Sequence, residues 1–243
     1  DLKIYTGDIQ GGLNSYSESL KIREEIGDKK GIAETLNNIG AVYNQQKDIV
    51  KAEDYFLRSL KIREEIGDRI GIAKSLNNMG ILNKNKVNKT LALEYYAKSL
   101  KIREELEDKL GVAISCNNIG SIYNIMGNWP EALKYFNRSL KIKKELGDKE
   151  SLSTSYNNIG GLLLNQEKYS IALNYGDSAI TLAKELGFPY NIMHAEHLIA
   201  QADSGLGNYQ QAFEHYKQFI VYRDSINNEG TRKASIKSQL KYA

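Results

Sequence analysis

The chain has 243 residues and a formal net charge of only +3, from 33 Lys and Arg against 30 Asp and Glu. Because the two signs are mixed along the chain, no basic footprint for nucleic acid is present. No apolar run approaches the roughly 18 residues of a membrane span. A single cysteine excludes an internal disulfide and a cysteine-based zinc cluster. Neither a cofactor nor a nucleic-acid partner is therefore expected.

The first residues, from Asp1 to Ile4, show no signal-peptide pattern and no initiator methionine. We therefore expect the sequence to be a piece of a longer protein. The low cysteine content is consistent with a reducing, cytoplasmic compartment, and a cysteine-poor periplasmic sensor portion is the alternative.

A repeat of about 40 residues dominates the sequence. The stretch "SLKIREEIGD" begins at Ser19 and again at Ser59, with the related stretches "SLKIREELED" at Ser99 and "SLKIKKELGD" at Ser139. A fixed period of 20 to 50 residues indicates a solenoid or a propeller, and the pattern inside the repeat distinguishes the two.

That pattern is helical. Leu36, Ile39, Gly40 and Tyr43 follow the i, i+3, i+4, i+7 spacing of one helix face, and alternating β-branched runs are absent. Pairs such as Gly27-Asp28 predict a helix that ends at glycine and a next helix capped by aspartate. The same pair recurs at 67–68 and 147–148. The sequence therefore predicts an all-α chain of helix pairs.

The spacing of Leu36, Ile39, Gly40 and Tyr43, followed by Ala52 and Phe56 in the next helix, resembles the tetratricopeptide repeat. The usual unit has 34 residues, and the longer unit here is similar to that of kinesin light chains and Leu-Gly-Asn scaffolds. The resemblance covers roughly residues 8–227. It implies a right-handed α-solenoid, a superhelix with a concave groove lined by the first helix of each repeat.

We predict a single solenoid domain whose N-terminal part, 1–28, holds only a second helix. The full repeats are predicted at 31–68, 71–108, 111–148 and 151–188, with a divergent repeat at 190–227 and a capping or linker helix at 228–243. In the repeat at 71–108, Asn83 and Lys89 replace apolar or aromatic residues, so its helix–helix joint is expected to be the wettest.

An asparagine pair recurs in the first helix of four repeats, although asparagine is a poor helix former. Since each helical residue turns about 100°, both amides point away from the packing stripe and toward the implied groove. A carboxamide donates and accepts at once, which matches a peptide backbone. We therefore predict two columns of peptide-binding residues. The first column is Asn38, Asn78, Asn118 and Asn158, and the second is Asn37, Asn77, Asn117 and Asn157.

Two alternatives to ligand binding stay open for these columns. The amides can bond to neighbouring helices and join the repeats, or the pair can be a relic of recent duplication. Duplication has left other copies, because "KIREE" occurs three times on a face that is expected to be solvated. The asparagine pair nevertheless persists at 157–158, where "KIREE" has changed.

Selectivity is expected from groove positions that vary between repeats. These include Glu34, Lys74, Ile114 and Thr154, and also Ala41, Ile81, Ser121 and Gly161. Asn44, Lys84 and Asn124 lie further along, and Lys74, Lys84 and Lys86 form a positive spot that either meets an acidic guest or is ordinary solvated surface.

No catalytic or metal site is predicted. His194 and His197 lie one helical turn apart, but no cysteine is near them. Cys116 takes the core position of Leu36 and is expected to be buried. The stretch "GGLLLN" at Gly160 lacks the lysine of a phosphate-binding loop.

The sequence therefore predicts a non-catalytic scaffold that binds a protein or peptide in the concave groove, as a monomer or weak homo-oligomer. Two alternatives remain. The region is the sensor of a larger signalling protein with a histidine kinase, cyclase or transcription-regulator output, or it is a self-associating assembly module.

Overall fold

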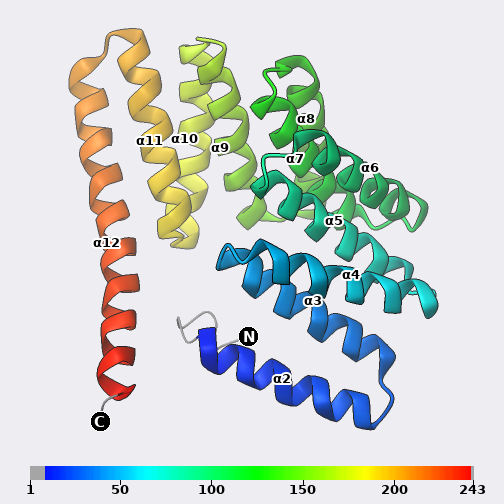
Figure 1. The fold of residues 1–243 in the computed structure, drawn as a ribbon. Coiled ribbons are helices and arrows are strands. Elements are labelled where there is room, and N and C mark those ends of the chain that lie inside the picture. Colours follow the sequence, from blue (N-terminus) through cyan, green and yellow to red (C-terminus); the bar gives the residue numbers. More distant parts are fainter. Residues whose placement is uncertain (1–8, 242–243) are drawn as a thin grey trace. The chain divides into compact units, whose positions relative to one another are not determined.

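The computed structural model describes residues 9–241, and the side chains of residues 9–228. Over these residues every regular element is a helix (Figure 1). The helices are α2 (Ile9–Glu25), α3 (Lys29–Gln45), α4 (Ile49–Glu65), α5 (Arg69–Asn85), α6 (Lys89–Glu105), α7 (Lys109–Ile125), α8 (Trp129–Leu146), α9 (Lys149–Asn165), α10 (Tyr169–Leu186), α11 (Pro189–Leu206) and α12 (Tyr209–Lys241). The all-α prediction is confirmed.

The helices belong to two compact units that divide between Ser115 and Cys116, inside α7. In unit 1, α3 packs against α4 and α5 packs against α6, while α4 also contacts α5. In unit 2, α9 packs against α10 and α11 packs against α12. The predicted solenoid of consecutive helix pairs is thereby confirmed.

First helices of consecutive repeats also touch directly. α3 contacts α5 in unit 1, and α9 contacts α11 in unit 2. Within each unit these helices therefore share one face, which is the face that carries the asparagine pairs.

The predicted helix boundaries have the expected chemistry. Gly27 adopts a φ of 71°, a left-handed conformation that costs glycine little, and ends α2. Asp28 Oδ1 then accepts the Gly31 backbone N–H at 2.9 Å and caps α3. Asp68 and Asp148 cap α5 and α9 in the same way.

Close contact between the two helices of a repeat depends on the repeated glycine. A Cβ atom on Gly40 would lie 2.7 Å from Phe56 Cδ1, and one on Gly120 would lie 2.7 Å from Phe136 Cδ1. Any larger side chain would therefore push the two helices apart. The glycine and the aromatic residue act as one packing pair.

The expectation of a wet joint in the repeat at 71–108 is wrong at Asn83. Its side chain is only 2% exposed, and Nδ2 donates to the Met79 backbone oxygen at 2.8 Å. The amide is therefore buried and makes this hydrogen bond on its own helix.

The tail predicted at 228–243 continues α12, which runs without a break from Tyr209 to Lys241. Its side chains beyond residue 228, and residues 242–243, lie outside the described part. Residues 1–8 of the predicted half repeat lie outside it as well. The predicted repeat limits and single domain stay predictions.

The "KIREE" segment is not wholly solvated, because its arginine is buried. Arg63 is 4% exposed, and Nη1 donates to the Gly71 backbone oxygen at 2.6 Å and to Ser75 Oγ at 2.8 Å. Burial lowers the pKa of the Arg63 guanidinium, while the nearby Asp68 carboxylate opposes the shift. Arg103 makes the equivalent bonds one repeat later. The arginine therefore joins the second helix of one repeat to the first helix of the next.

In unit 2 a lysine takes this position. Lys143 Nζ donates to Ser155 Oγ at 2.8 Å and to the Ser151 backbone oxygen at 3.3 Å. The junction therefore requires a long cationic donor, and not the guanidinium itself.

We predict that Arg63→Ala lowers the free energy of unfolding by about 2–4 kcal/mol, because it strands buried acceptors and removes packed methylenes. Arg63→Lys should lower the free energy of unfolding much less, since Lys143 makes the equivalent bonds in unit 2. Arg58→Ala, on the exposed side of α4, is the control and should change the value by less than about 0.5 kcal/mol. Urea denaturation measures all three, and equal effects of the two alanine variants would refute the junction's importance.

A second prediction concerns Glu107, which has a φ of 55° at the position where other repeats carry Gly27 or Gly67. A non-glycine residue in the left-handed conformation costs about 1–2 kcal/mol of stability. Replacing it with glycine removes this cost, but the more flexible unfolded state of glycine offsets part of the gain. Glu107→Gly should therefore raise the free energy of unfolding by about 0.5–1 kcal/mol. Lys101→Gly inside α6 is the control and should lower it by about 1 kcal/mol. A fall for both variants would contradict the prediction.

Candidate functional site

The eight predicted asparagines lie on four first helices, α3, α5, α7 and α9. Asn37 and Asn77 are buried, at 9% and 7% exposed, whereas Asn117 and Asn157 are half-buried. The other column, Asn38, Asn78, Asn118 and Asn158, is half-buried throughout. In unit 1 the second column is therefore less accessible to a guest than the first, whereas in unit 2 both columns are half-buried.

Asparagines of consecutive repeats bond to each other. Asn78 Nδ2 donates to Asn37 Oδ1 at 3.0 Å in unit 1, and Asn158 Nδ2 donates to Asn117 Oδ1 at 2.9 Å in unit 2. Both pairs are 41 residues apart, which is one repeat plus one residue. We call this set of bonds the amide ladder.

Parallel rungs lie nearer the helix C-termini. Asn85 Nδ2 donates to Asn44 Oδ1 at 3.0 Å, and Asn165 Nδ2 donates to Asn124 Oδ1 at 3.3 Å. Asn44 and Asn124 were predicted as groove residues, while Asn85 and Asn165 were missed. The separation of 41 between them was the available signal.

The ladder supports the alternative in which these amides join the repeats. Asn37 and Asn117 use their oxygens for it, and Asn78 and Asn158 use one N–H. An asparagine side chain has two N–H donors and an acceptor with two lone pairs, so one rung does not exhaust the half-buried column. A ligand role for either column stays a prediction.

The predicted positive spot is partly neutralised. Lys74 and Lys84 are exposed, but Lys86 Nζ lies 2.6 Å from Glu53 Oε2 on the neighbouring helix α4.

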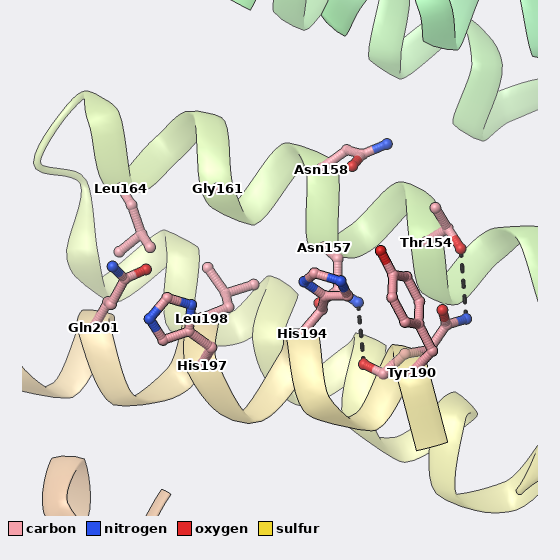
Figure 2. Close-up of a pocket in the computed structure, with 11 residues that line it drawn as sticks. Thr154, Asn157, Asn158, Gly161, Leu164, Tyr190, His194, His197, Leu198 and Gln201 are labelled. Atoms are coloured by element: carbon pink, nitrogen blue, oxygen red, sulfur yellow. Dashed lines mark hydrogen bonds between the residues drawn. The ribbon is translucent and has the colours of Figure 1, made fainter. Parts of the chain in front are cut away.

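A cavity of about 370 Å³ opens between α9 and α11, entirely within unit 2 (Figure 2). Its lining residues are Thr154, Asn157, Asn158, Gly161, Leu164, Tyr190, Asn191, His194, His197, Leu198 and Gln201. None of these side chains is an acid, a lysine or an arginine. The sequence analysis had placed Thr154 and Gly161 at groove positions but had missed the contribution of α11, because that helix lies in the divergent repeat.

The two histidines in the cavity each contact an aromatic ring: His194 meets Tyr190 edge-on, and His197 stacks on Phe219. The His194 and Tyr190 ring centroids lie 4.4 Å apart, and those of His197 and Phe219 lie 4.5 Å apart. Burial lowers the pKa of His194, with a smaller contribution from His197, and burial also lowers the pKa of His197. Both rings are therefore neutral at pH 7.

The third histidine belongs to a different contact. His215 Nδ1 lies 2.6 Å from Glu196 Oε2, and Lys184 Nζ lies 3.2 Å from the other oxygen of this buried carboxylate. This cluster ties α10, α11 and α12 together. Among the described residues, no group of three or more His, Cys, Asp or Glu side chains is arranged to hold a metal ion.

One amide in the cavity differs from its equivalents. Asn157 Nδ2 donates to the Asn191 backbone oxygen at 3.3 Å, while Asn157 Oδ1 is buried and has no hydrogen-bond partner. Figure 2 shows Asn157 directed from α9 toward α11, whereas Asn158 points away from α11.

Within the described part of the chain, no helix combines the length and the apolar character that crossing a membrane requires.

Known structures resemble this fold. BtubC from P. vanneervenii matches with a TM-score of 0.78 at 18% identity, covering 90% of this chain and 92% of that one. A putative kinesin light chain from Podosopora anserina with TPR-like repeats matches with a TM-score of 0.65 at 13% identity, covering 80% and 96%. A Rap protein complexed with Competence and Sporulation Factor matches with a TM-score of 0.73 at 15% identity, covering 94% and 73%. At identities this low, the structural similarity establishes a shared fold and not a shared function.

A search of curated proteins found no match. A family model described as "Tetratricopeptide repeat" matches residues 1–65, 31–105, 71–145 and 111–185 in overlapping segments. These segments together cover more than half of the sequence and span the glycine–aromatic packing pairs described above. The chain therefore belongs to the tetratricopeptide repeat family.

Proposed function

We propose that this protein is a non-catalytic scaffold that binds an extended polypeptide segment on the face formed by its first helices. In unit 1 that face belongs to α3 and α5, and in unit 2 to α9 and α11. The observation that carries the proposal is the half-buried column of amides, in which Asn78 and Asn158 keep hydrogen-bonding capacity beyond the one N–H that each uses in the ladder.

The ladder makes these amides suitable for recognition. Asn78 is held in place by its bond to Asn37, so a guest does not have to order a free side chain, which would cost about 0.5–1.5 kcal/mol. Packed helices lie about 8–10 Å apart, and an extended chain advances about 3.3 Å per residue. One amide would therefore meet the guest backbone at about every third residue.

Neighbouring exposed side chains would provide selectivity, and they differ between the units. Unit 1 presents Glu34 and Lys74 beside its asparagines, whereas unit 2 presents Thr154 at the same repeat position. A guest with charged side chains suits unit 1, and an uncharged stretch suits unit 2.

The family relationship supports binding in place of catalysis, since tetratricopeptide repeats are generally interaction scaffolds and no catalytic family is indicated. The similar Rap protein was solved in complex with Competence and Sporulation Factor. The sensor and self-association alternatives stay predictions, because no separate observation favours either.

The ladder bond itself is tested by a double-mutant cycle on Asn37 and Asn78. Asn78→Ala should lower the free energy of unfolding by about 1–3 kcal/mol, because it leaves the buried Asn37 oxygen unpaired. Adding Asn37→Ala should restore most of that loss, because no acceptor is then left unpaired. The coupling free energy between the two side chains should be at least about 0.5–1.5 kcal/mol. Zero coupling in urea melts would mean that the rung contributes nothing to stability.

Peptide binding is tested with an unbiased peptide array followed by affinity measurements on the captured peptides. The Asn37→Ala/Asn78→Ala double variant, which keeps no unpaired ladder amide, should weaken binding at least about tenfold, the equivalent of one or two hydrogen bonds. Asn137→Ala on α8, an exposed residue of a second helix, is the matched control and should bind like the wild type. An array without any captured peptide, or equal losses in both variants, would overturn the proposal.

A further inference from the structure

The amide ladder ends at the cavity between α9 and α11. Asn37 Oδ1 and Asn117 Oδ1 each accept a hydrogen bond from an asparagine 41 residues later. The same step from Asn157 leads to residue 198, which is a leucine. Leu198 has no donor, so the rung that would satisfy Asn157 is missing.

Rotating the Asn157 side-chain amide by about 180° would not give its oxygen a partner. Its Nδ2 donates to the Asn191 backbone oxygen, so exchanging the two amide ends would place two acceptors against each other. The oxygen therefore stays buried and without a partner. Buried acceptors are paired in the great majority of cases, and an unpaired one is a reason to look for its partner.

The cavity around this oxygen is polar but uncharged. The side chains of Asn191 and Gln201 contribute amides beside Asn157, and Leu164 and Leu198 contribute an apolar wall. His194 and His197 are neutral at pH 7 because burial lowers the pKa of each. A guest cation would find no counter-charge among the lining residues, and neither would a guest anion, so desolvation would disfavour both.

We propose that this cavity binds the side-chain carboxamide of an asparagine or glutamine in the guest polypeptide, with the guest N–H donating to Asn157 Oδ1. The guest amide thereby supplies the donor that Leu198 does not. This inference rests on the proposed function only in that the guest is a polypeptide.

The remaining chemistry of the cavity fits the other end of the same group. A carboxamide also carries an oxygen, and Gln201 and the neutral imidazoles lining the cavity provide N–H donors for it. A hydroxyl or a lone backbone N–H would donate to Asn157 Oδ1, but it lacks the carbonyl oxygen that would accept from these N–H donors. A volume of about 370 Å³ is at the small end for ligand sites, which suits one side chain with its flanking backbone.

The binding test uses alanine pentapeptides with Asn, Gln, Asp, Lys or Leu as the central residue. Their N-terminus is acetylated and their C-terminus is an N-methylamide, so that the central residue supplies the only primary carboxamide. NMR titration follows the ring protons of His194 and His197. The Asn and Gln peptides should shift these signals and bind at least about tenfold more tightly than the other three. Preference for Asp, Lys or Leu, or no shift with any peptide, would overturn the inference. The peptide array and the Asn37/Asn78 variant decide the wider proposal independently in unit 1.

Matched variants identify the atom. Asn157→Ala should weaken the Asn peptide at least about tenfold, whereas Asn137→Ala, an exposed asparagine of the second helix α8 and outside the cavity lining, should bind like the wild type. Unchanged binding by Asn157→Ala would overturn the inference.

Thermal melts of the unliganded variants give a readout that does not depend on any peptide. Asn157→Ala removes an unpaired oxygen together with the 3.3 Å bond from Nδ2 to the Asn191 backbone oxygen, so the two effects oppose each other and the melting temperature should change little. Asn117→Ala removes a rung and should lower it. A fall for Asn157→Ala as large as that for Asn117→Ala would show that the oxygen already has a partner, and would refute the premise.

Discussion

A carboxamide buried between helices must find hydrogen-bond partners there, and in this protein the partner lies one repeat and one residue further along the chain. The bonds Asn78–Asn37 and Asn158–Asn117 meet this requirement. Each asparagine costs up to about 0.7 kcal/mol of helix propensity relative to alanine, while a hydrogen bond returns about 0.5–1.5 kcal/mol net. The two terms are of similar size, so the pairs are tolerated in helices because the repeat supplies their partners. Because the propensity cost and the hydrogen-bond gain nearly cancel, using the asparagine pair for recognition would cost the fold little stability.

The same logic governs the other polar groups between repeats. Arg63 and Arg103 place a cation where the first turn of the next helix offers a carbonyl and a serine, and Lys143 does so in unit 2. None of these groups is satisfied within its own repeat. Stability in such a protein is therefore carried by nearest-neighbour contacts, and a change in one repeat affects the adjacent one. The divergent last repeat matters for this reason, because Leu198 removes a donor that the previous repeat needs.

The local rules in the sequence were sufficient for the fold. The period, the glycine–aromatic pairs such as Gly40 and Phe56, and the aspartate caps predicted the helices and their pairing. The predictions failed for polar side chains whose hydrogen-bond partners the residue pattern does not reveal. Arg63 was read as solvated because its acceptors lie beyond its own helix, and Asn83 was read as wet although it bonds to Met79 on the same helix. The ladder was half predicted: the columns were recognised, but the bond between them required the offset of one residue. The cavity was missed because it depends on α11, where the repeat pattern breaks down.

We propose that a polypeptide binds on the first-helix face and there satisfies the amide that the repeat leaves unpaired. A crystal structure of the protein with an asparagine-containing peptide tests this binding mode. We expect the guest carboxamide nitrogen at about 2.7–3.2 Å from Asn157 Oδ1, the range of an N–H···O bond. A peptide bound on the second helices, with the cavity between α9 and α11 empty, would contradict the proposal.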